Sequence, residues 1–293
     1  MVIVIVGPTG VGKTKLSIEL AKRINGEIIN ADSTQVYKGL DIGTAKVRED
    51  EKEGIPHHLF DIKDINDNYT VYDYQKDARA CIDDILSRGK TPILVGGTGL
   101  YIKACLYNYE FSDEDSSNYV DESKTNDELY QKLLEIDPNT DVHKNNRKRI
   151  IRNLNAYYKN GFINKNRSDK LLYDVCFIGL TTDRDILYER INKRVDMMVS
   201  NGLLQEAKKL YDSNIRTKAV MTPICYKELF PYFEGTKDLE LCSEDIKKGS
   251  RKYAKRQYTW NKNQFNVNWF DVCFDNFDDT VDKVLEYIKD VKN

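Results

Sequence analysis

The stretch "GPTGVGKT" at residues 7–14 limits what this chain can fold into more than any other segment. It fits the pattern GxxxxGK[ST], with Gly7, Gly12, Lys13 and Thr14 in register. The glycines let the backbone curl so that its N–H groups face one anion. Lys13 then neutralises phosphate oxygens, and the Thr14 hydroxyl can hold a magnesium ion. The loop therefore predicts a phosphate site, although it does not say whose phosphate is bound.

The segments on either side of this loop are the ones that it needs. Residues 2–6 form a continuous β-branched run, typical of a buried parallel strand, and residues 13–24 carry apolar residues at helical spacing. Further strands are predicted at 27–30, 92–95, 174–180 and 267–272, and further helices at 71–86, from 183 to 201 and after the last strand. This order predicts an α/β fold, a P-loop NTPase-like parallel sheet flanked by helices.

The alternation of strands and helices stops between residues 109 and 172. An acidic loop, a helix at 126–136 and a basic helix at 145–159 follow one another there. We therefore predict an inserted helical lobe at 109–172, and a core made of residues 1–108 and 173–293.

Composition indicates a globular protein. The 293 residues are 40% hydrophobic and 31% charged, with a net charge of −2. Apolar runs stay well short of the roughly 20 residues of a membrane helix, and Met1 leads directly into a strand. Six scattered cysteines suggest neither zinc nor disulfides. We expect a cytoplasmic monomer without membrane contact.

Charge is segregated along the chain. Residues 110–128 contain eight acids and one lysine, whereas residues 142–168 contain eight basic residues and no acid. Residues 247–262 add seven basic residues, again without an acid. Two basic stretches in a nearly neutral protein favour a localised anionic partner, although solvated helix faces would give the same pattern.

Two polar residues are predicted at the carboxyl edge of the sheet, where open α/β folds hold ligands. Asp32 lies two residues after the strand at 27–30, and Thr98 follows the glycines of "GGTGLY" at 96–101. Asp32 could bind magnesium through water, or it could accept a proton from a nucleophile. The strand at 92–95 ends without the acid that motor and signalling NTPases place there for magnesium.

Five motifs together resemble the tRNA dimethylallyltransferases. They are "GPTGVGKT", "INADSTQVYKGLDIGTAK" at 29–46, "IPHHLFDI" at 55–62, "RGKTPILVGGTGLYIKA" at 88–104 and "SRKYAKRQYTW" at 250–260. The resemblance covers nearly the whole chain in the same order. It implies transfer of a dimethylallyl group from dimethylallyl diphosphate to N6 of adenosine 37 in tRNA, with release of diphosphate.

The resemblance also implies roles for individual residues. Asp32 would be the base, Thr98 would orient it and the amine, and Lys13 with Thr14-bound Mg²⁺ would stabilise the diphosphate. The residues implied to bind the diphosphate are Gly7, Pro8, Thr9, Gly10, Val11, Gly12, Lys13, Thr14 and Lys227. Whether ATP also binds this loop stays open.

A target base in a stacked anticodon loop must be flipped out, which needs a firm hold on the flanking backbone. Lys144, Lys148 and Arg152 recur every fourth residue on one predicted helical face, with Arg147 and Arg149 alongside. Trp260 is expected in the core. The residues predicted to contact tRNA are Arg147, Lys148, Arg149, Arg152, Arg251, Lys255 and, by resemblance, Asp32, Ser33, Thr34 and Gln35.

The chain departs from the family pattern at several positions. "VMTPICYKE" at 220–228 has Pro223 and Cys225 where alanine and glycine are usual, and Lys227 where a basic residue near the diphosphate is usual. "HKNN" at 143–146 and "TWNK" at 259–262 also differ, and the inserted lobe is short. These changes concern substrate positioning more than the reaction.

Three other functions stay compatible with the loop and the sheet. A small-molecule kinase would use ATP and an arginine-rich lid, for which the acidic segment from Glu110 is poorly suited. A binding module without catalysis is suggested by the changes near Cys225, whereas Asp32, Thr98 and the complete loop favour an enzyme. An adenylate isopentenyltransferase would have little use for the basic helix at 145–159.

Overall fold

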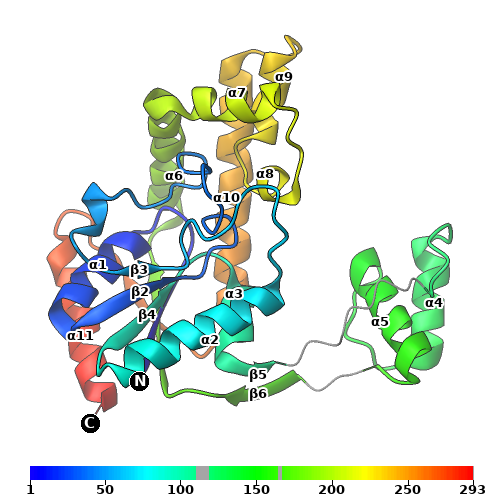
Figure 1. Cartoon of the computed structure of the whole chain (residues 1–293), viewed down its shortest axis with the longest axis horizontal. Helices are drawn as coiled ribbons and strands as arrows, with labels where there is room; N and C mark the ends of the chain where they lie inside the picture. Colours follow the sequence, from blue (N-terminus) through cyan, green and yellow to red (C-terminus); the bar gives the residue numbers. More distant parts are fainter. Residues whose placement is uncertain (110–118, 164–166, 293) are drawn as a thin grey trace. The chain divides into compact units, whose positions relative to one another are not determined.

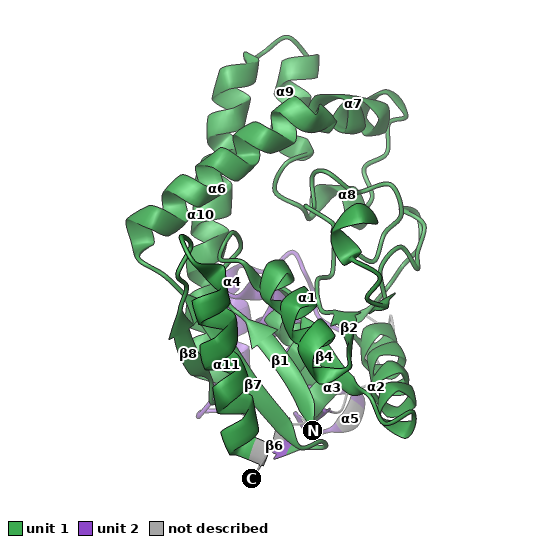
Figure 2. Cartoon of the chain, turned by 90° about the vertical axis from the view of Figure 1, so that its left-hand side faces the viewer, with its two compact units in different colours: residues 1–107, 171–293 green, residues 108–170 purple. Residues whose placement is uncertain are grey.

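The computed structural model describes residues 1–109, 119–163 and 167–292 of the chain. The chain divides into two compact units, coloured separately in Figure 2. Unit 1 comprises residues 1–107 and 171–293, and unit 2 comprises residues 108–170. The first nine residues of the acidic stretch, 110–118, lie outside the described part.

Unit 1 is built on a six-stranded parallel sheet with the strand order β3-β2-β4-β1-β7-β8 (Figure 1). The strands are β1 (Val2–Val6), β2 (Gly26–Asn30), β3 (His57–His58), β4 (Thr91–Val95), β7 (Val175–Thr181) and β8 (Asn268–Asp271). The predicted α/β fold with a parallel sheet is confirmed. β3 is only two residues long, which is too short for an alternation of apolar and polar residues that would predict a strand.

Both faces of the sheet are covered because alternate residues of each strand face opposite sides. In β1, Val2, Val4 and Val6 belong to one apolar cluster, and Ile3 and Ile5 belong to the other. Helices α1 (Lys13–Ile24) and α11 (Phe277–Lys292) supply the second cluster, whereas α2 (Val71–Ser87) and α3 (Gly99–Leu106) supply the first (Figure 1). The uniformly buried β1 is therefore a strand of a sheet that lies between two layers of helices.

The remaining helices of unit 1 extend from the end of the sheet where the glycine loop lies (Figures 1 and 2). They are α6 (Arg184–Met198), the π-helix η2 (Val199–Leu203), α7 (Leu204–Asp212), α8 (Lys218–Met221), η3 (Lys227–Leu229), α9 (Phe230–Phe233) and α10 (Leu239–Gln264). The helix predicted to run to residue 201 ends as an α-helix at Met198, because Gly202, with φ 106°, interrupts the regular helical geometry that follows. A short 3₁₀ helix, η1 (Asp50–Lys52), lies in the long connection after β2.

Unit 2 contains the helices α4 (Asn126–Ile136) and α5 (Arg147–Asn160), which enclose a small apolar cluster that includes Leu129, Leu133, Ile150 and Leu154. The predicted start of α5 was two residues early. The Asn146 side chain accepts a hydrogen bond from the backbone N–H of Arg149 and caps the helix there.

Because α5 begins at Arg147, Lys144 precedes the helix and does not extend the face that Lys148 and Arg152 share. A two-stranded sheet of β5 (Tyr107–Tyr109) and β6 (Arg167–Leu171) was not expected. The sequence "RSDKL" of β6 has too little apolar alternation to predict a strand. Among the helices described, none is both long enough and apolar enough to cross a membrane.

Candidate active site

A cavity of about 1090 Å³ lies in unit 1 at the carboxyl ends of β1, β2 and β4, with further walls from α6 and α10. This is the edge at which parallel α/β sheets hold ligands. The predicted site residues that line the cavity are Thr9, Gly10, Gly12, Lys13, Thr14, Asp32, Ser33, Thr34, Gln35 and Lys227. Residues from both halves of the sequence therefore meet in one space.

The glycine loop forms the floor of this cavity. Gly12, with φ 105°, ends the loop in a left-handed conformation that glycine adopts without strain, and α1 starts at the next residue. The Lys13 Nζ donates to the carbonyl oxygens of Gly7 at 3.0 Å and Pro8 at 2.9 Å. Burial, with the neighbouring Arg194 charge, lowers the pKa of Lys13 to about 8, and Asp32 acts in the opposite direction. The Lys13 ammonium is thus held by neutral carbonyl oxygens, and its charge is available to an anion in the cavity.

Asp32 follows β2 in a turn that its neighbours hold in place. The Asn30 side chain accepts from the backbone N–H of Asp32 at 2.8 Å and donates to the Asp32 carbonyl oxygen at 3.1 Å. Thr34 donates to the Asp32 Oδ1 twice, from its backbone N–H at 3.0 Å and from its hydroxyl at 2.7 Å. One carboxylate oxygen is therefore fixed by Thr34, and the side chain lines the cavity.

Thr98 is brought next to this turn by the glycines that follow β4. The backbone N–H of Thr98 donates to the Ala31 carbonyl oxygen at 3.0 Å. A Cβ at Gly96 would lie 2.2 Å from the Ala31 carbonyl carbon, so only glycine permits this approach. The Thr98 hydroxyl accepts from the backbone N–H of Ser33 and donates to the Ser33 hydroxyl at 3.2 Å. Thr98 precedes α3, but its side chain does not cap that helix.

Two arginines of α6 reach the glycine loop, and the sequence analysis missed both. Arg194 donates to the Thr9 hydroxyl at 2.8 Å, and the Arg190 Nε donates to the Gly10 carbonyl oxygen at 3.1 Å. Burial lowers the pKa of the Arg194 guanidinium. Their spacing of four residues places both arginines on one face of the predicted helix. Nothing in the sequence, however, linked that helix to the loop.

Helix α10 contributes to the cavity a face that the sequence analysis did not predict. Gln257 accepts from the backbone N–H of Thr9 at 2.8 Å and donates to the Gly97 carbonyl oxygen at 3.1 Å. Ser250, Tyr253 and Arg256 line the cavity with it. Arg251 and Lys255 do not line the cavity; Arg251 donates instead to the Asn192 side chain at 2.5 Å. Trp260 packs, as expected, against an apolar cluster of the core.

The segment near position 225 also contributes to the cavity, through Pro223 and Lys227. The Cys225 thiol donates to the Gly43 carbonyl oxygen at 3.1 Å, and Lys227 donates to the Met221 carbonyl oxygen at 3.0 Å. Glu206 of α7 accepts from the backbone N–H groups of three consecutive residues, Asp41, Ile42 and Gly43, at 2.9–3.1 Å. Cys225 is therefore packed into the structure that holds the loop after residue 40.

In unit 2, the four basic residues predicted on α5 fall into two pairs. Arg147 donates to the carbonyl oxygens of Lys124 and Glu122 and to the Asn126 side chain, and Arg149 pairs with Asp141 at 3.1 Å. Lys148 and Arg152 are exposed, with no ion pair to any other described residue. Lys148 and Arg152 can therefore contact a partner directly, whereas Arg147 and Arg149 would first have to give up their present hydrogen bonds or ion pair.

The fold and the site together define a P-loop protein in which two half-buried cations, Lys13 and Arg194, and a carboxylate meet in one cavity. Residues 35–264 match the family described as IPP transferase. The chain is 50% identical to the tRNA dimethylallyltransferase of Anoxybacillus flavithermus, with 98% of this chain and 96% of that protein covered.

Solved structures agree with this result. The full-length tRNA isopentenylpyrophosphate transferase of Bacillus halodurans superposes with a TM-score of 0.77 at 43% identity, covering 99% of this chain and 96% of that one. A eukaryotic dimethylallyltransferase, described as acting on tRNA, gives a TM-score of 0.85 at 35% identity, covering 97% and 77%. The chain belongs to the IPP transferase family, which confirms the resemblance seen in its motifs.

Proposed function

We propose that the donor is dimethylallyl diphosphate and that the acceptor is N6 of adenosine 37 in tRNA. Transfer of a dimethylallyl group to tRNA is the activity of this enzyme, a prenyltransferase. The proposal therefore concerns the identity of the donor and the acceptor atom, and the roles of the residues in the cavity.

The floor of the cavity suits a diphosphate leaving group. Backbone N–H groups at the start of α1, the Lys13 ammonium and the Arg194 guanidinium are positive groups that would meet the negative charge that develops as the C–O bond breaks. Thr9 would act mainly by positioning, because its N–H is taken by Gln257 and its hydroxyl oxygen by Arg194. An apolar wall for the isoprenoid is available in the same cavity, formed by Ile191, Val195, Met198, Ile224 and Ile246.

Asp32 is the group that we assign to the acceptor. An exocyclic adenine amine is a weak nucleophile, and its reaction becomes easier when a carboxylate accepts the proton as the N–C bond forms. Thr34 fixes the carboxylate, and Thr98 fixes the neighbouring Ser33, so the base is held before the substrate arrives. The proton would pass from N6 to Asp32, and diphosphate would leave with the bonding electrons.

Magnesium fits the residues present. Thr14 and Asp32 both line the cavity and offer a hydroxyl and a carboxylate oxygen, the hard ligands that Mg²⁺ prefers. When bound with the diphosphate, the ion would neutralise part of the charge on the leaving group. Thr14 would hold the ion directly, and Asp32 would stay free to accept the proton.

The single observation that carries this proposal is the meeting of Asp32 with Lys13 and Arg194 in one cavity. Burial lowers the pKa of both cations there, and the Asp32 carboxylate opposes this lowering. A carboxylate beside a phosphate seat suits deprotonation of an acceptor next to a leaving diphosphate. The test is to incubate the protein with labelled dimethylallyl diphosphate, Mg²⁺ and one acceptor: tRNA, AMP or shikimate.

Label is expected in tRNA, at N6 of adenosine 37, and not in AMP or shikimate. A tRNA with guanosine at position 37 is the matched control and should gain no label. Label in AMP alone would instead identify an adenylate isopentenyltransferase. Phosphoryl transfer from ATP to shikimate would identify a kinase.

We also propose a cytoplasmic monomer. Light scattering after gel filtration should give one species near the chain mass of 34.0 kDa. After cell fractionation, the protein should be found in the same fraction as other tRNA-modifying activities and not in the membrane fraction.

A further inference from the structure

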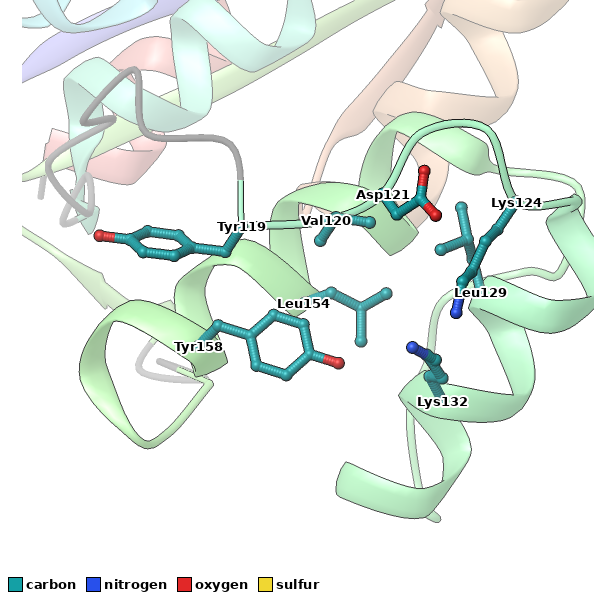
Figure 3. A pocket seen from close by; sticks show the side chains of 8 residues that line it. All are labelled: Tyr119, Val120, Asp121, Lys124, Leu129, Lys132, Leu154 and Tyr158. Carbon is teal, nitrogen blue, oxygen red and sulfur yellow. The ribbon is translucent and has the colours of Figure 1, made fainter.

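Unit 2 has a pocket of its own, of about 420 Å³, shown in Figure 3. Its residues all come from this unit, between Tyr119 and Tyr158. The volume lies within the roughly 300–1,000 Å³ typical of small-ligand sites and is too small for a nucleic-acid duplex. The pocket is lined by residues of unit 2 alone, and its volume matches one small group.

The pocket has an apolar base. Val120, Leu129 and Leu154 line it, and all three are buried in the small core of the unit. Two large rings stand at its edge: Tyr119 is 49% exposed and Tyr158 is 43% exposed. Aromatic rings beside an apolar base are the surface on which unpaired nucleobases stack in proteins that bind single-stranded RNA.

Positive donors complete the site. Figure 3 shows the amino groups of Lys124 and Lys132 and the hydroxyl of Tyr158 directed into the same space. Neither lysine makes an ion pair with another residue of the described ranges. Asp121 also lines the pocket, but its Oδ1 already accepts from the backbone N–H and the hydroxyl of Ser123. Two half-buried lysines next to exposed rings suit a phosphate and the base attached to it.

We propose that this pocket binds one unpaired nucleotide of the tRNA substrate. The base stacks on Tyr158 or Tyr119 over the apolar residues, and its phosphate lies on Lys124 and Lys132. This inference rests on tRNA being the substrate. It adds to the basic face of α5 a site that recognises an unpaired nucleotide instead of the backbone alone.

The first experiment measures the affinity of the full chain for two RNAs, an anticodon stem-loop and a blunt duplex without unpaired nucleotides. Tyr158→Leu is expected to weaken stem-loop binding about five-fold or more, and to leave duplex binding unchanged. Phe162→Leu is the matched control, because Phe162 is a 60% exposed ring of the same unit that does not line the pocket. It should bind both RNAs like the wild type.

Lys132→Gln tests the phosphate contact. The slope of log affinity against log salt for the stem-loop should fall by about 0.7, the value for one single-strand phosphate contact. Lys208→Gln is the control, since Lys208 pairs with Asp212 on α7 in unit 1. Crosslinking of a 4-thiouridine-labelled stem-loop, mapped by mass spectrometry, should modify Tyr119 or Tyr158.

Unchanged stem-loop affinity in Tyr158→Leu and Lys132→Gln, with crosslinks mapped elsewhere, would overturn the pocket assignment. An equal loss for stem-loop and duplex would overturn it too, since it would indicate contact with paired backbone. The same variants are assayed for dimethylallyl transfer. Wild-type activity in variants that also bind normally removes the pocket and leaves the proposed function intact, whereas a wild-type protein inactive on every tRNA removes the proposed function itself.

Discussion

Gln257 on α10 accepts a hydrogen bond from the backbone N–H of Thr9 at 2.8 Å, 248 positions away in the sequence. The same side chain donates to the Gly97 carbonyl oxygen at 3.1 Å. One amide group thus joins the glycine loop, where the diphosphate is proposed to bind, to the turn that precedes Thr98. Helix α10 therefore holds the two parts of the site in fixed positions relative to one another. Its motif alone would predict RNA binding.

We expect Gln257→Met to lower kcat/KM about tenfold or more, because it removes both hydrogen bonds while keeping the volume, and small displacements of reacting groups are costly. The fall should appear mainly in kcat, with the melting temperature little changed. Gln264→Met is the matched control on the same helix, since Gln264 pairs with Lys103 outside the cavity. Equal kinetics for the two variants would contradict a positioning role.

Asp32→Asn should slow transfer by about 100-fold or more, because the amide keeps the shape of the side chain but cannot accept the proton. Binding of diphosphate, measured by calorimetry in the presence of Mg²⁺, should stay close to that of the wild type. A parallel loss of diphosphate affinity would show that Asp32 acts through the metal ion instead.

Arg194→Gln should raise the KM for dimethylallyl diphosphate about 10- to 100-fold, the equivalent of about 1.5–3 kcal/mol for a charge-assisted hydrogen bond. Arg194→Lys should recover part of this loss, since a point charge neutralises phosphate without the planar fork. The control is Arg184→Gln on the same helix, where the guanidinium lies over the Tyr188 ring outside the cavity. A KM that rises equally for tRNA would argue against a role specific to the diphosphate.

The lowered pKa of Lys13, about 8, predicts a pH dependence of donor binding. Below this value Lys13 is charged and attracts the diphosphate, and above it the free enzyme loses the proton, so kcat/KM for the donor should fall as pH rises through about 8. Arg194 and Asp32 face the same ammonium from α6 and from the turn after β2. Lys13→Arg should move the fall to higher pH, and a flat profile between pH 7 and 9 in the wild type would contradict the assignment.

At the other end of the sheet, Glu27 of β2 has a side chain only 3% exposed and pairs with Arg88, Lys90 and His58. These hydrogen bonds, that to Arg88 foremost, hold its pKa well below the ordinary value. Glu27→Gln should lower the free energy of unfolding by about 2–3 kcal/mol at pH 7, less than for a fully buried pair because the partners are partly hydrated.

The sign of the pH effect follows from the direction of that shift. A depressed pKa stabilises the folded state above the unfolded pKa, and the benefit is lost as pH falls below about 4.3. The gap between wild type and Glu27→Gln in urea titrations should therefore shrink as the solution is acidified. A gap that stays constant down to acid pH would show that packing, and not charge, is responsible.

Local pattern was enough to predict the bounds of several elements in both units. The bounds of β1, α1 and α4 agree with the sequence prediction, because a β-branched run, a capping box and helical spacing are all encoded within a few residues. The order of these elements then predicted the parallel sheet and the position of Asp32 at its carboxyl edge.

Long-range contacts could not be predicted in this way. Arg194 reaches Thr9 across 185 positions, and Gln257 reaches the same residue across 248. Charge indicated Arg251 and Lys255 on α10 as tRNA contacts, but the sequence did not show that Tyr253 and Gln257 of the same helix line the cavity. Which face of a helix meets a cavity depends on its packing partners, and a single sequence does not contain that information.

The attachment of the loop after residue 40 to Glu206 has a consequence for how this enzyme responds to heat. Three amide protons in a segment without regular structure are held by one carboxylate of α7, and Gly43 and Thr44 of that segment line the cavity. Fraying of α7 would release this wall while the sheet and the glycine loop stay folded. Warming would then abolish turnover at a lower temperature than the one at which the bulk of the protein melts.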